Sequence, residues 1–308
     1  MFVVQEGERN AFDQRLLEYS LLEKYALTAP PPSHLPFTNT TYCRHGIKTY
    51  RVTLSEIAEL TAIDPGTRAL LFRPRHRGVR AGPIEVSTVY FRAGYGPGDY
   101  TLPVHWAARK RIERSRAIKC PTILTQLAGS KKIQQVLCEP ETVKRFLFPK
   151  DVASIEGTFA GIYPLDGHTE EGRSARRMAL GAPERFVLKP QREGGGNNVY
   201  GEKIPAFLKE VGEETWGGYV LMELIKAPKG LSNAMVREGK MVSGEVIGEL
   251  GVYGVALWEV IHGNNGLRTI TMKENKEVGW LLRTKAKESE EGGVAAGFGC
   301  VDAVLLVD

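Results

Sequence analysis

Hydrophobic positions recur along the chain at alternating strand-like and helix-like spacings, and this alternation predicts an α/β fold. Val3 and Val4 form an apolar run that we expect to be a strand, and a helix follows it. Apolar side chains at helical spacing predict one buried face on this helix: Phe12, Leu16, Tyr19 and Leu22. Further on, the pattern predicts strands at 48–52, 69–72 and 83–91 and a helix over 53–60.

The second part of the chain continues in the same manner. We expect a basic helix over 106–120, and helical sequence over 122–138 that is interrupted by a small-residue turn at 127–132. The remaining predicted elements are a strand at 186–188, a helix at 204–211, a strand at 219–223 and paired strands at 242–252 and 254–262. In contrast, Leu27 to Thr41 carries four prolines without periodicity, which predicts a loop or insertion outside any core.

The length of 308 residues permits one large domain or two ordinary ones, and we expect two. The first covers 1–120 and includes the proline-rich insertion at about 27–41, and the second covers 121–308. Net charge is only +5, with 41 basic against 36 acidic residues, which disfavours a dedicated nucleic-acid binder. No window reaches the length of a membrane span, and the four cysteines are widely separated, so we expect a cytoplasmic protein with reduced thiols.

Candidate chemistry is concentrated in the stretch from Arg185 to Tyr200, RFVLKPQREGGGNNVY. A predicted strand there brings Lys189, Arg192 and Glu193 directly before three glycines. Successive glycine N–H groups can surround a phosphate, cations balance its charge, and a carboxylate can hold the accompanying metal ion. The P-loop and GxGxxG patterns are both absent, and a flexible surface turn is the alternative interpretation.

Two clusters near the start of the chain are candidates for an acid-substrate site. Glu8, Arg9, Asn10 and Gln14 follow the first predicted strand, at the edge where open α/β sheets bind ligands, although ordinary capping also explains them. Arg92 and Tyr95 follow another predicted strand, where a guanidinium can bind a carboxylate in a fork or serve a structural role in a turn. The basic run 73–80 is more typical of a solvated loop than of a nucleic-acid interface.

The C-terminal part contributes one acid, two cations and a second small-residue loop. Glu249 lies in a predicted strand pair, where it either faces solvent or needs a cation or hydroxyl as partner. Arg283 and Lys285 lie at alternate positions of a strand, so they face one site together. The glycine-rich loop at 292–297 can close over a ligand. The six histidines show no hydrolytic triad pattern, so these features together favour ATP chemistry at an acid substrate.

Five blocks of the sequence resemble the eukaryotic-type glutathione synthetase family, in the family's order. They are ERNAFDQR at 8–15, YFRAGY at 90–95, ERSRAIKCPTILTQLAGSKKIQQ at 113–135, KPQREGGGNNVYGE at 189–202, and LLRTKA with GGVAAG at 281–297. The resemblance implies a permuted ATP-grasp fold with an inserted Rossmann-like parallel-sheet domain for substrate and glycine-rich lid loops. It also implies Mg²⁺ and the ATP-dependent ligation of γ-glutamylcysteine to glycine through an acyl phosphate.

The same resemblance implies roles for individual residues. Three are implied to act in catalysis: Lys189, Arg92 and Arg283. Residues implied to bind ATP are Lys131, Lys189, Pro190, Gln191, Arg192, Glu193, Gly194, Gly195, Gly196, Asn197, Asn198, Tyr200, Met222, Glu223, Leu224, Ile225, Glu249, Lys285 and Glu291. Within that set, Met222 to Ile225 would hold adenine, Glu249 the nucleotide hydroxyls, and Glu193 the magnesium ion. Residues implied to meet the substrate are Glu8, Arg9, Asn10, Gln14, Arg92, Ala93, Gly94, Tyr95, Arg283, Val294 and Ala295.

Three departures from the family pattern limit what the resemblance implies. Glu291 replaces a usual aspartate, and Ala93 replaces a common acid. The family also carries a long segment before ERN with two further magnesium ligands, so we expect low or no activity from this chain alone. The alternative is a non-catalytic form that binds nucleotide or associates with the full-length enzyme. The resemblance implies a homodimer and no nucleic-acid or membrane partner, and it leaves glycine, β-alanine and serine open as acceptor.

Overall fold

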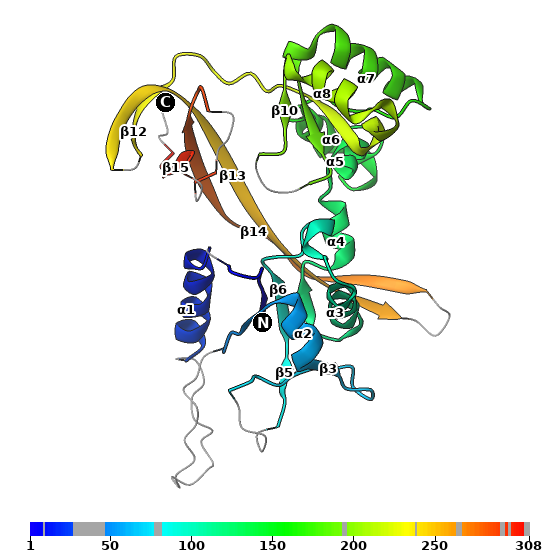
Figure 1. The fold of residues 1–308 in the computed structure, drawn as a ribbon, viewed down its shortest axis with the longest axis vertical. Helices are drawn as coiled ribbons and strands as arrows, with labels where there is room; N and C mark the ends of the chain where they lie inside the picture. The colour runs from blue at the N-terminus through cyan, green and yellow to red at the C-terminus, as the bar shows by residue number, and fades with distance from the viewer. Residues whose placement is uncertain are drawn as a thin grey trace.

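The computed structural model describes residues 1–8, 10–26, 47–76, 82–192, 196–237, 239–262, 267–289, 293–294 and 297–304. Figure 1 shows one body built from the N-terminal part of the chain, coloured blue to cyan, and a second body coloured mostly green. A long hairpin, yellow to orange, runs from the level of the second body toward that of the first. The two ends of the chain lie on different parts of the molecule.

The first body contains a parallel sheet in the order β2 (Arg51–Val52), β1 (Phe2–Val3), β6 (Thr88–Phe91), β7 (Ile118–Cys120). All three strand pairs are parallel, with Phe2 opposite both Arg51 and Tyr90. Parallel neighbours require crossover connections. The helical connections include α1 (Phe12–Ala26), α2 (Leu54–Leu60) and α3 (Pro103–Arg114). The parallel sheet thus agrees with the expected α/β class.

One buried cluster holds this body together. It joins Val3, Val89 and Phe91 from the sheet to Ile57 of α2 and Ile112 of α3. The helix expected over 53–60 is present as α2, and its first turn is held by a reciprocal capping box between Thr53 and Glu56. A second small sheet, β3 (Thr61–Ile63), β4 (Leu70–Phe72) and β5 (Ile84–Val86), is antiparallel and adds Leu70 and Phe72 to the same core.

Two predicted elements of this body are wrong in extent. The single strand expected at 83–91 is two strands, β5 and β6, which belong to different sheets. The helix expected over 106–120 ends at Arg114, where the Ser115 hydroxyl donates to the carbonyl of Ile112, and the chain continues as β7. In both cases the sheet supplies partners for backbone groups that sequence periodicity does not reveal.

Helix α1 contradicts the expectation of a buried apolar face. Phe12 is 85% exposed, Leu16 67% and Tyr19 51%, whereas Gln14 is completely buried. The polar side of the helix faces the sheet instead. There Gln14 accepts a hydrogen bond from Arg51 at 3.0 Å, and Glu18 pairs with the same arginine at 3.4 Å. An ion-pair network therefore decides which side of α1 is covered within the described part of the chain.

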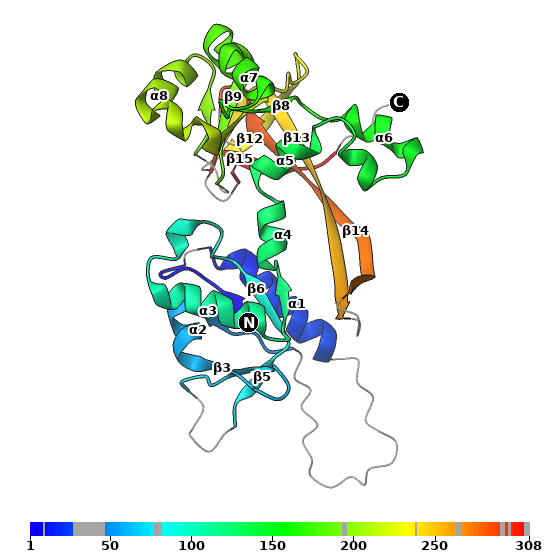
Figure 2. The same cartoon turned by 90° about the vertical axis from the view of Figure 1, so that its right-hand side faces the viewer.

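The second body is built on an antiparallel sheet in the order β10 (Val199–Tyr200), β9 (Phe186–Pro190), β11 (Tyr219–Glu223), β8 (Ile162–Pro164). Further helices are α4 (Ile123–Ala128), α5 (Lys131–Leu137), α6 (Pro149–Glu156), α7 (Glu170–Gly181) and α8 (Lys203–Val211). Figure 2 shows α4 between the two bodies. The predicted break between α4 and α5 is confirmed, with Gly129 as the cap of α4. A separate buried cluster includes Phe186, Leu188, Leu208 and Leu221.

The third sheet is dominated by two long strands. Its order is β12 (Ser232–Arg237), β13 (Lys240–His262), β14 (Arg268–Ala286), β15 (Gly299–Asp302). The paired strands expected at 242–252 and 254–262 are one continuous strand, β13, and its partner is β14. The turn expected near Gly254 is instead a register shift within this strand pair. Glycine inside a strand is common at such bulges as well as at turns.

None of the helices that the structure describes combines the length and the apolar composition needed to cross a membrane.

The separate core of the second body predicts the effect of one truncation. Leu188→Ala removes a completely buried side chain from β9, so we expect the free energy of unfolding to fall by about 2–5 kcal/mol. The matched control is Leu180→Ala in α7, where the leucine is 50% exposed, and the expected change is within about 0.5 kcal/mol. Urea unfolding of the full chain measures both, and equal losses in the two variants would contradict the assignment of this core.

Candidate functional site

Strand β9 positions the first candidate cation. Phe186, Val187 and Leu188 are buried, which confirms the predicted apolar strand, and the strand continues to Pro190. It is paired on both sides, with β10 and with β11, and Lys189 lies opposite Val220. A strand that is paired on both edges has little conformational freedom. The half-buried side chain of Lys189 therefore projects from a fixed position in the sheet.

The loop after β9 is joined to the N-terminus of α5. The side-chain oxygen of Gln191 accepts a hydrogen bond from the backbone N–H of Lys132 at 3.0 Å. This bond brings the segment of Lys131 to the segment of Lys189, two lysines that the family resemblance assigns to one nucleotide. Farther along the loop, Gly196 has a φ of +80°, and the Asn198 amide donates to the Tyr200 hydroxyl at 3.2 Å. Glu193, Gly194 and Gly195 lie outside the described residues.

The stretch assigned to adenine, Met222 to Ile225, forms the end of β11 and the residues after it. The backbone N–H of Glu223 donates to Gly161, and that of Leu224 donates to Arg185, both at 2.9 Å. Tyr163 donates to the Glu223 carboxylate at 3.0 Å. Burial, together with this hydrogen bond, raises the pKa of Tyr163, so its phenol remains a donor. Hydrogen bonds thus hold the stretch on two sides.

Three charged side chains meet on the third sheet. Glu249 of β13 lies directly opposite Arg283 of β14. Its carboxylate is 3.1 Å from Arg283 and 3.3 Å from Lys285, and the lysine side chain is only 14% exposed. Arg283 and Lys285 therefore lie on the same face of β14, both within ion-pair distance of Glu249. One of the two cations can leave the carboxylate and bind an anionic ligand. The carboxylate can then accept a hydrogen bond from a hydroxyl of that ligand.

The glycine-rich loop closes between β14 and β15. The N–H of Gly297 donates to Val294, and that of Phe298 donates to Gly293, each at 3.0 Å. On β15, Asp302 accepts a hydrogen bond from the buried Thr284, which lies between Arg283 and Lys285 in the sequence. This hydrogen bond lowers the pKa of Asp302. Glu291 and Ala295, which the sequence also assigned to this site, lie outside the described residues.

The candidate acid-substrate site lies at the carboxyl ends of β1 and β6, neighbouring parallel strands. The Glu8 carboxylate accepts from the N–H of Asn10, and the carbonyl of Asn10 accepts from the buried Gln14, both at 2.8 Å. These residues therefore order the link from β1 to α1. Arg9 lies outside the described residues.

The turn after β6 carries the other half of this group. Arg92 forms an ion pair with Asp13 of α1, and its guanidinium lies 5.8 Å from the Tyr90 ring centre. Sequence reasoning did not single out Asp13, which holds Arg92 as a substrate carboxylate would. Ala93 is buried, at 7% exposure, and burial raises the pKa of Tyr95. The structure thus brings Arg92 and the link from β1 to α1 to one edge of the sheet.

A buried clamp supports this turn, and the sequence analysis missed it. Arg109 of α3 is 3% exposed and donates to Tyr100 at 3.1 Å, to Gln126 at 3.0 Å and to Glu113 at 3.0 Å. Gln126 in turn donates to the carbonyls of Gly94 and Tyr95, at 2.8 and 2.9 Å. Arg109 belongs to a run of basic residues, and only its helical position distinguishes it, so periodicity gave no signal for its burial.

The candidate residues lie on three different sheets. The Lys189 group belongs to the β8–β11 sheet, the Glu249 group to the β12–β15 sheet, and the Arg92 group to the parallel sheet. In the part of the chain that the structure describes, no group of three or more His, Cys, Asp or Glu residues could hold a metal ion.

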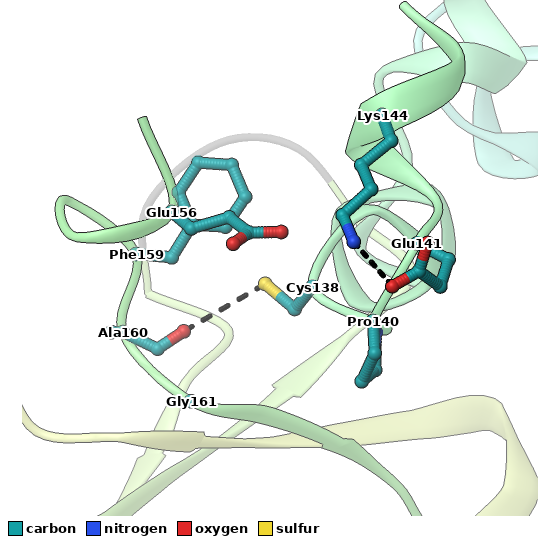
Figure 3. A pocket seen from close by; sticks show the side chains of 8 residues that line it. All are labelled: Cys138, Pro140, Glu141, Lys144, Glu156, Phe159, Ala160 and Gly161. Carbon is teal, nitrogen blue, oxygen red and sulfur yellow. Dashed lines mark hydrogen bonds and ion pairs between the residues drawn. The ribbon is translucent and has the colours of Figure 1, made fainter. Parts of the chain in front are cut away.

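An open hollow of about 370 Å³ lies elsewhere on the second body, and none of the predicted site residues lines it. Figure 3 shows Lys144 and Glu141 pointing toward each other, at 2.5 Å, and the Cys138 thiol directed at the carbonyl of Ala160, at 3.8 Å. Lys144, Glu141 and Cys138 therefore already have partners within the chain.

Comparisons with known proteins identify the family. The sequence model described as "Eukaryotic glutathione synthase, ATP binding domain" matches residues 14–306. Glutathione synthetase of Xenopus laevis is 41% identical over 311 residues, which cover 100% of this chain and 56% of that protein. The human glutathione synthetase is 41% identical over 98% of this chain and 56% of its own length. The "Glutathione synthetase large chain" of Schizosaccharomyces pombe is 37% identical over 99% of this chain and 54% of its own length.

A solved structure supports the fold. A glutathione synthetase-like effector from Globodera pallida, in its apo form, superposes with a TM-score of 0.52 over 85% of this chain and 49% of that chain, at 21% identity. The chain spans about half the length of the curated relatives it matches. By the match over 14–306 and by identities of 37–41% along nearly its whole length, this chain belongs to the eukaryotic glutathione synthase family, in the part that includes the ATP-binding domain.

Proposed function

We propose that this chain carries the nucleotide and acid-substrate sites of a glutathione synthetase, an ATP-dependent carboxylate–amine ligase. The reaction joins γ-glutamylcysteine to glycine and releases glutathione, ADP and phosphate. The observation that carries the proposal is the 41% identity to two glutathione synthetases along almost the entire chain. The gathering of Glu249, Arg283 and Lys285 on one face supports it, because a nucleotide site needs such cations beside an acid.

The mechanism follows from charge. The cysteinyl carboxylate is a poor electrophile, so the γ-phosphoryl group of ATP is first transferred to it, and the glycine amine then attacks the acyl phosphate. Lys189, Lys131 and Lys285 would spread the charge that develops on the phosphoryl oxygens. Arg283 and Arg92 would bind the substrate carboxylates, with Arg92 exchanging Asp13 for its ligand. A closed loop over 292–297 would keep water from the acyl phosphate.

The finer description of the fold belongs to the same proposal. We assign the second body and the third sheet to a permuted ATP-grasp fold with glycine-rich lids, and the parallel sheet to an inserted substrate domain. The division at 1–120 and 121–308 is supported by the two buried clusters, which fall on either side of it.

Cofactor, assembly and location complete the proposal. Magnesium, when bound, neutralises phosphate charge, and Glu193 is the residue that we assign to it. The proposed small-molecule partners are ATP, γ-glutamylcysteine and glycine, with a homodimer as the assembly and the cytoplasm as the location. Glycine is the proposed acceptor, and turnover with β-alanine or serine in its place tests that choice.

The proposed nucleotide site predicts that loss of the Lys189 side chain weakens ATP binding. Lys189→Ala removes a cation that we place on the ATP phosphates, so calorimetry should show ATP affinity lower by about tenfold to a hundredfold. Lys209→Ala, an exposed lysine in the last turn of α8, is the matched control and should bind ATP like the unmodified chain. Equal affinities in all three proteins would contradict the assignment of Lys189.

Turnover decides between a ligase and a nucleotide-binding form. With Mg-ATP, γ-glutamylcysteine and glycine, a working ligase releases ADP only when both other substrates are present. The alternative is a form that binds nucleotide or associates with the full-length enzyme. ATP binding without ADP release would support that alternative and would remove the ligase proposal for the chain alone.

The proposed acid-substrate site predicts that a methyl group added at Gly94 weakens dipeptide binding. Gly94 has a φ of +86°, and a Cβ there would approach the Tyr100 hydroxyl to 2.9 Å. We expect Gly94→Ala to cost about 1–3 kcal/mol of folding free energy and to weaken γ-glutamylcysteine binding while ATP affinity persists. Gly98→Ala is the control in the same turn, because its Cβ would meet nothing within 4 Å. Unchanged dipeptide affinity in the Gly94 variant would exclude this turn from the site.

A further inference from the structure

The turn that follows β6 is flexible by sequence, yet it is held by several hydrogen bonds in the structure. Residues 92–98, RAGYGPG, contain three glycines, and Gly94 adopts a φ of +86°, which other residues rarely adopt. The carboxylate of Asp99 accepts hydrogen bonds from the N–H groups of Gly94, Tyr95 and Gly96, at 2.9, 2.7 and 3.3 Å. Asp99 therefore holds the donor side of the turn from within the first body.

The acceptor side of the same turn is held by Gln126 of α4. Its amide nitrogen donates to the carbonyls of Gly94 and Tyr95, at 2.8 and 2.9 Å. Its amide oxygen accepts from the buried Arg109 at 3.0 Å, so the amide has a fixed orientation. An amide donates and accepts at once, whereas an ionised carboxylate in its place has nothing to donate. Gln126 makes these contacts from a position 32 residues beyond Gly94 in the chain.

Helix α4 is tied to the first body at two points, and both ties involve Arg109. At the start of the helix, the N–H of Ile123 donates to the Glu113 carboxylate at 3.0 Å, and the same oxygen accepts from Arg109 at 3.0 Å. In the last turn of the helix, Gln126 accepts from Arg109. One buried guanidinium therefore fixes both the start of α4 and the side chain that holds the turn.

Gln126 also lies close in the chain to the candidate ATP residues. Its carbonyl accepts from the N–H of Gly129 at 3.2 Å, at the end of α4. The chain continues through Ser130 into α5, which packs against β8 and β11 of the second body. There the N–H of Lys132 donates to Gln191 in the loop after β9. Figure 2 shows α4 between the two bodies, so this helix connects the two candidate sites.

We propose that Gln126 is a positioning residue of the ligase, which fixes the turn of the acid-substrate site to the helix that leads into the ATP-binding segment. The inference rests on the proposed function, because it needs a dipeptide at the turn and a nucleotide beside α5. Phosphoryl transfer to a carboxylate requires reacting atoms about 3–3.5 Å apart, and a misplacement of about 1 Å can lower the rate about a hundredfold. The hydrogen bonds of Gln126 restrict the separation between the two substrates.

The test replaces the donating amide and preserves the size of the side chain. Gln126→Glu retains an acceptor for Arg109, but a carboxylate oxygen then faces two carbonyl oxygens. We expect γ-glutamylcysteine affinity to fall at least about tenfold and ATP affinity to change by less than about twofold, both measured by calorimetry on the full chain. Gln134→Glu, the same change at an exposed glutamine of α5, is the matched control and should preserve both affinities.

The difference between the two ligands separates positioning from folding. A residue that serves folding alone would weaken both affinities or neither, so either result with Gln126→Glu would overturn the proposal. An unmodified chain that binds no γ-glutamylcysteine would refute the proposed function itself, and this inference would fall with it.

Hydrogen exchange on the unmodified chain provides a test that does not depend on the folding of Gln126→Glu. γ-Glutamylcysteine should slow exchange in residues 94–96 and also in residues 129–132, because Gln126 joins these two segments. Slower exchange in the turn alone would overturn the proposal.

Discussion

The register between β13 and β14 is the constraint on which most of the candidate chemistry depends. It places Glu249 opposite Arg283, and Lys285 on the same face within ion-pair distance of that carboxylate. A slip of one residue would move every side chain of one strand to the other face of the ribbon. It would separate the acid from its cations and expose polar groups where Val252 and Trp280 now lie. The candidate nucleotide site therefore depends on this register.

The candidate acid-substrate site depends on a different interaction, the burial of Arg109. A guanidinium removed from water is costly unless it is paired and hydrogen-bonded, and here Glu113, Tyr100 and Gln126 supply partners. Its guanidinium also lies 4.0 Å from the ring centre of Phe91. Through Gln126 and Tyr100 this buried group holds the backbone of Gly94 and Tyr95 in place. A charged network in the first body thus fixes the turn that begins at Arg92.

Helix α1 shows how such networks override hydrophobic patterning. The pattern Phe12, Leu16 and Tyr19 predicts an apolar inner face, yet the inner side carries Gln14 and Glu18, held by Arg51. Hydrogen bonds to a buried side chain are lost in full if the helix rotates, whereas exposed apolar groups lose only part of their transfer free energy. The polar contacts therefore set the rotation of the helix in the described chain.

Local sequence was sufficient for elements whose signals are strong and short-range. Residues next to one another in the chain were enough to predict the buried strand at 186–188, the strand Tyr219–Glu223, the helix over 53–60 and the turn near Gly129. The five family blocks likewise identified the family and the candidate residues. Only the tertiary structure decided that 83–91 divides between two sheets, that Gly254 lies within one long strand, and that Arg109 alone of its basic run is buried so completely. The reason is physical: pairing, bulges and buried charges depend on partners tens of residues away, and such distances leave no trace in local periodicity.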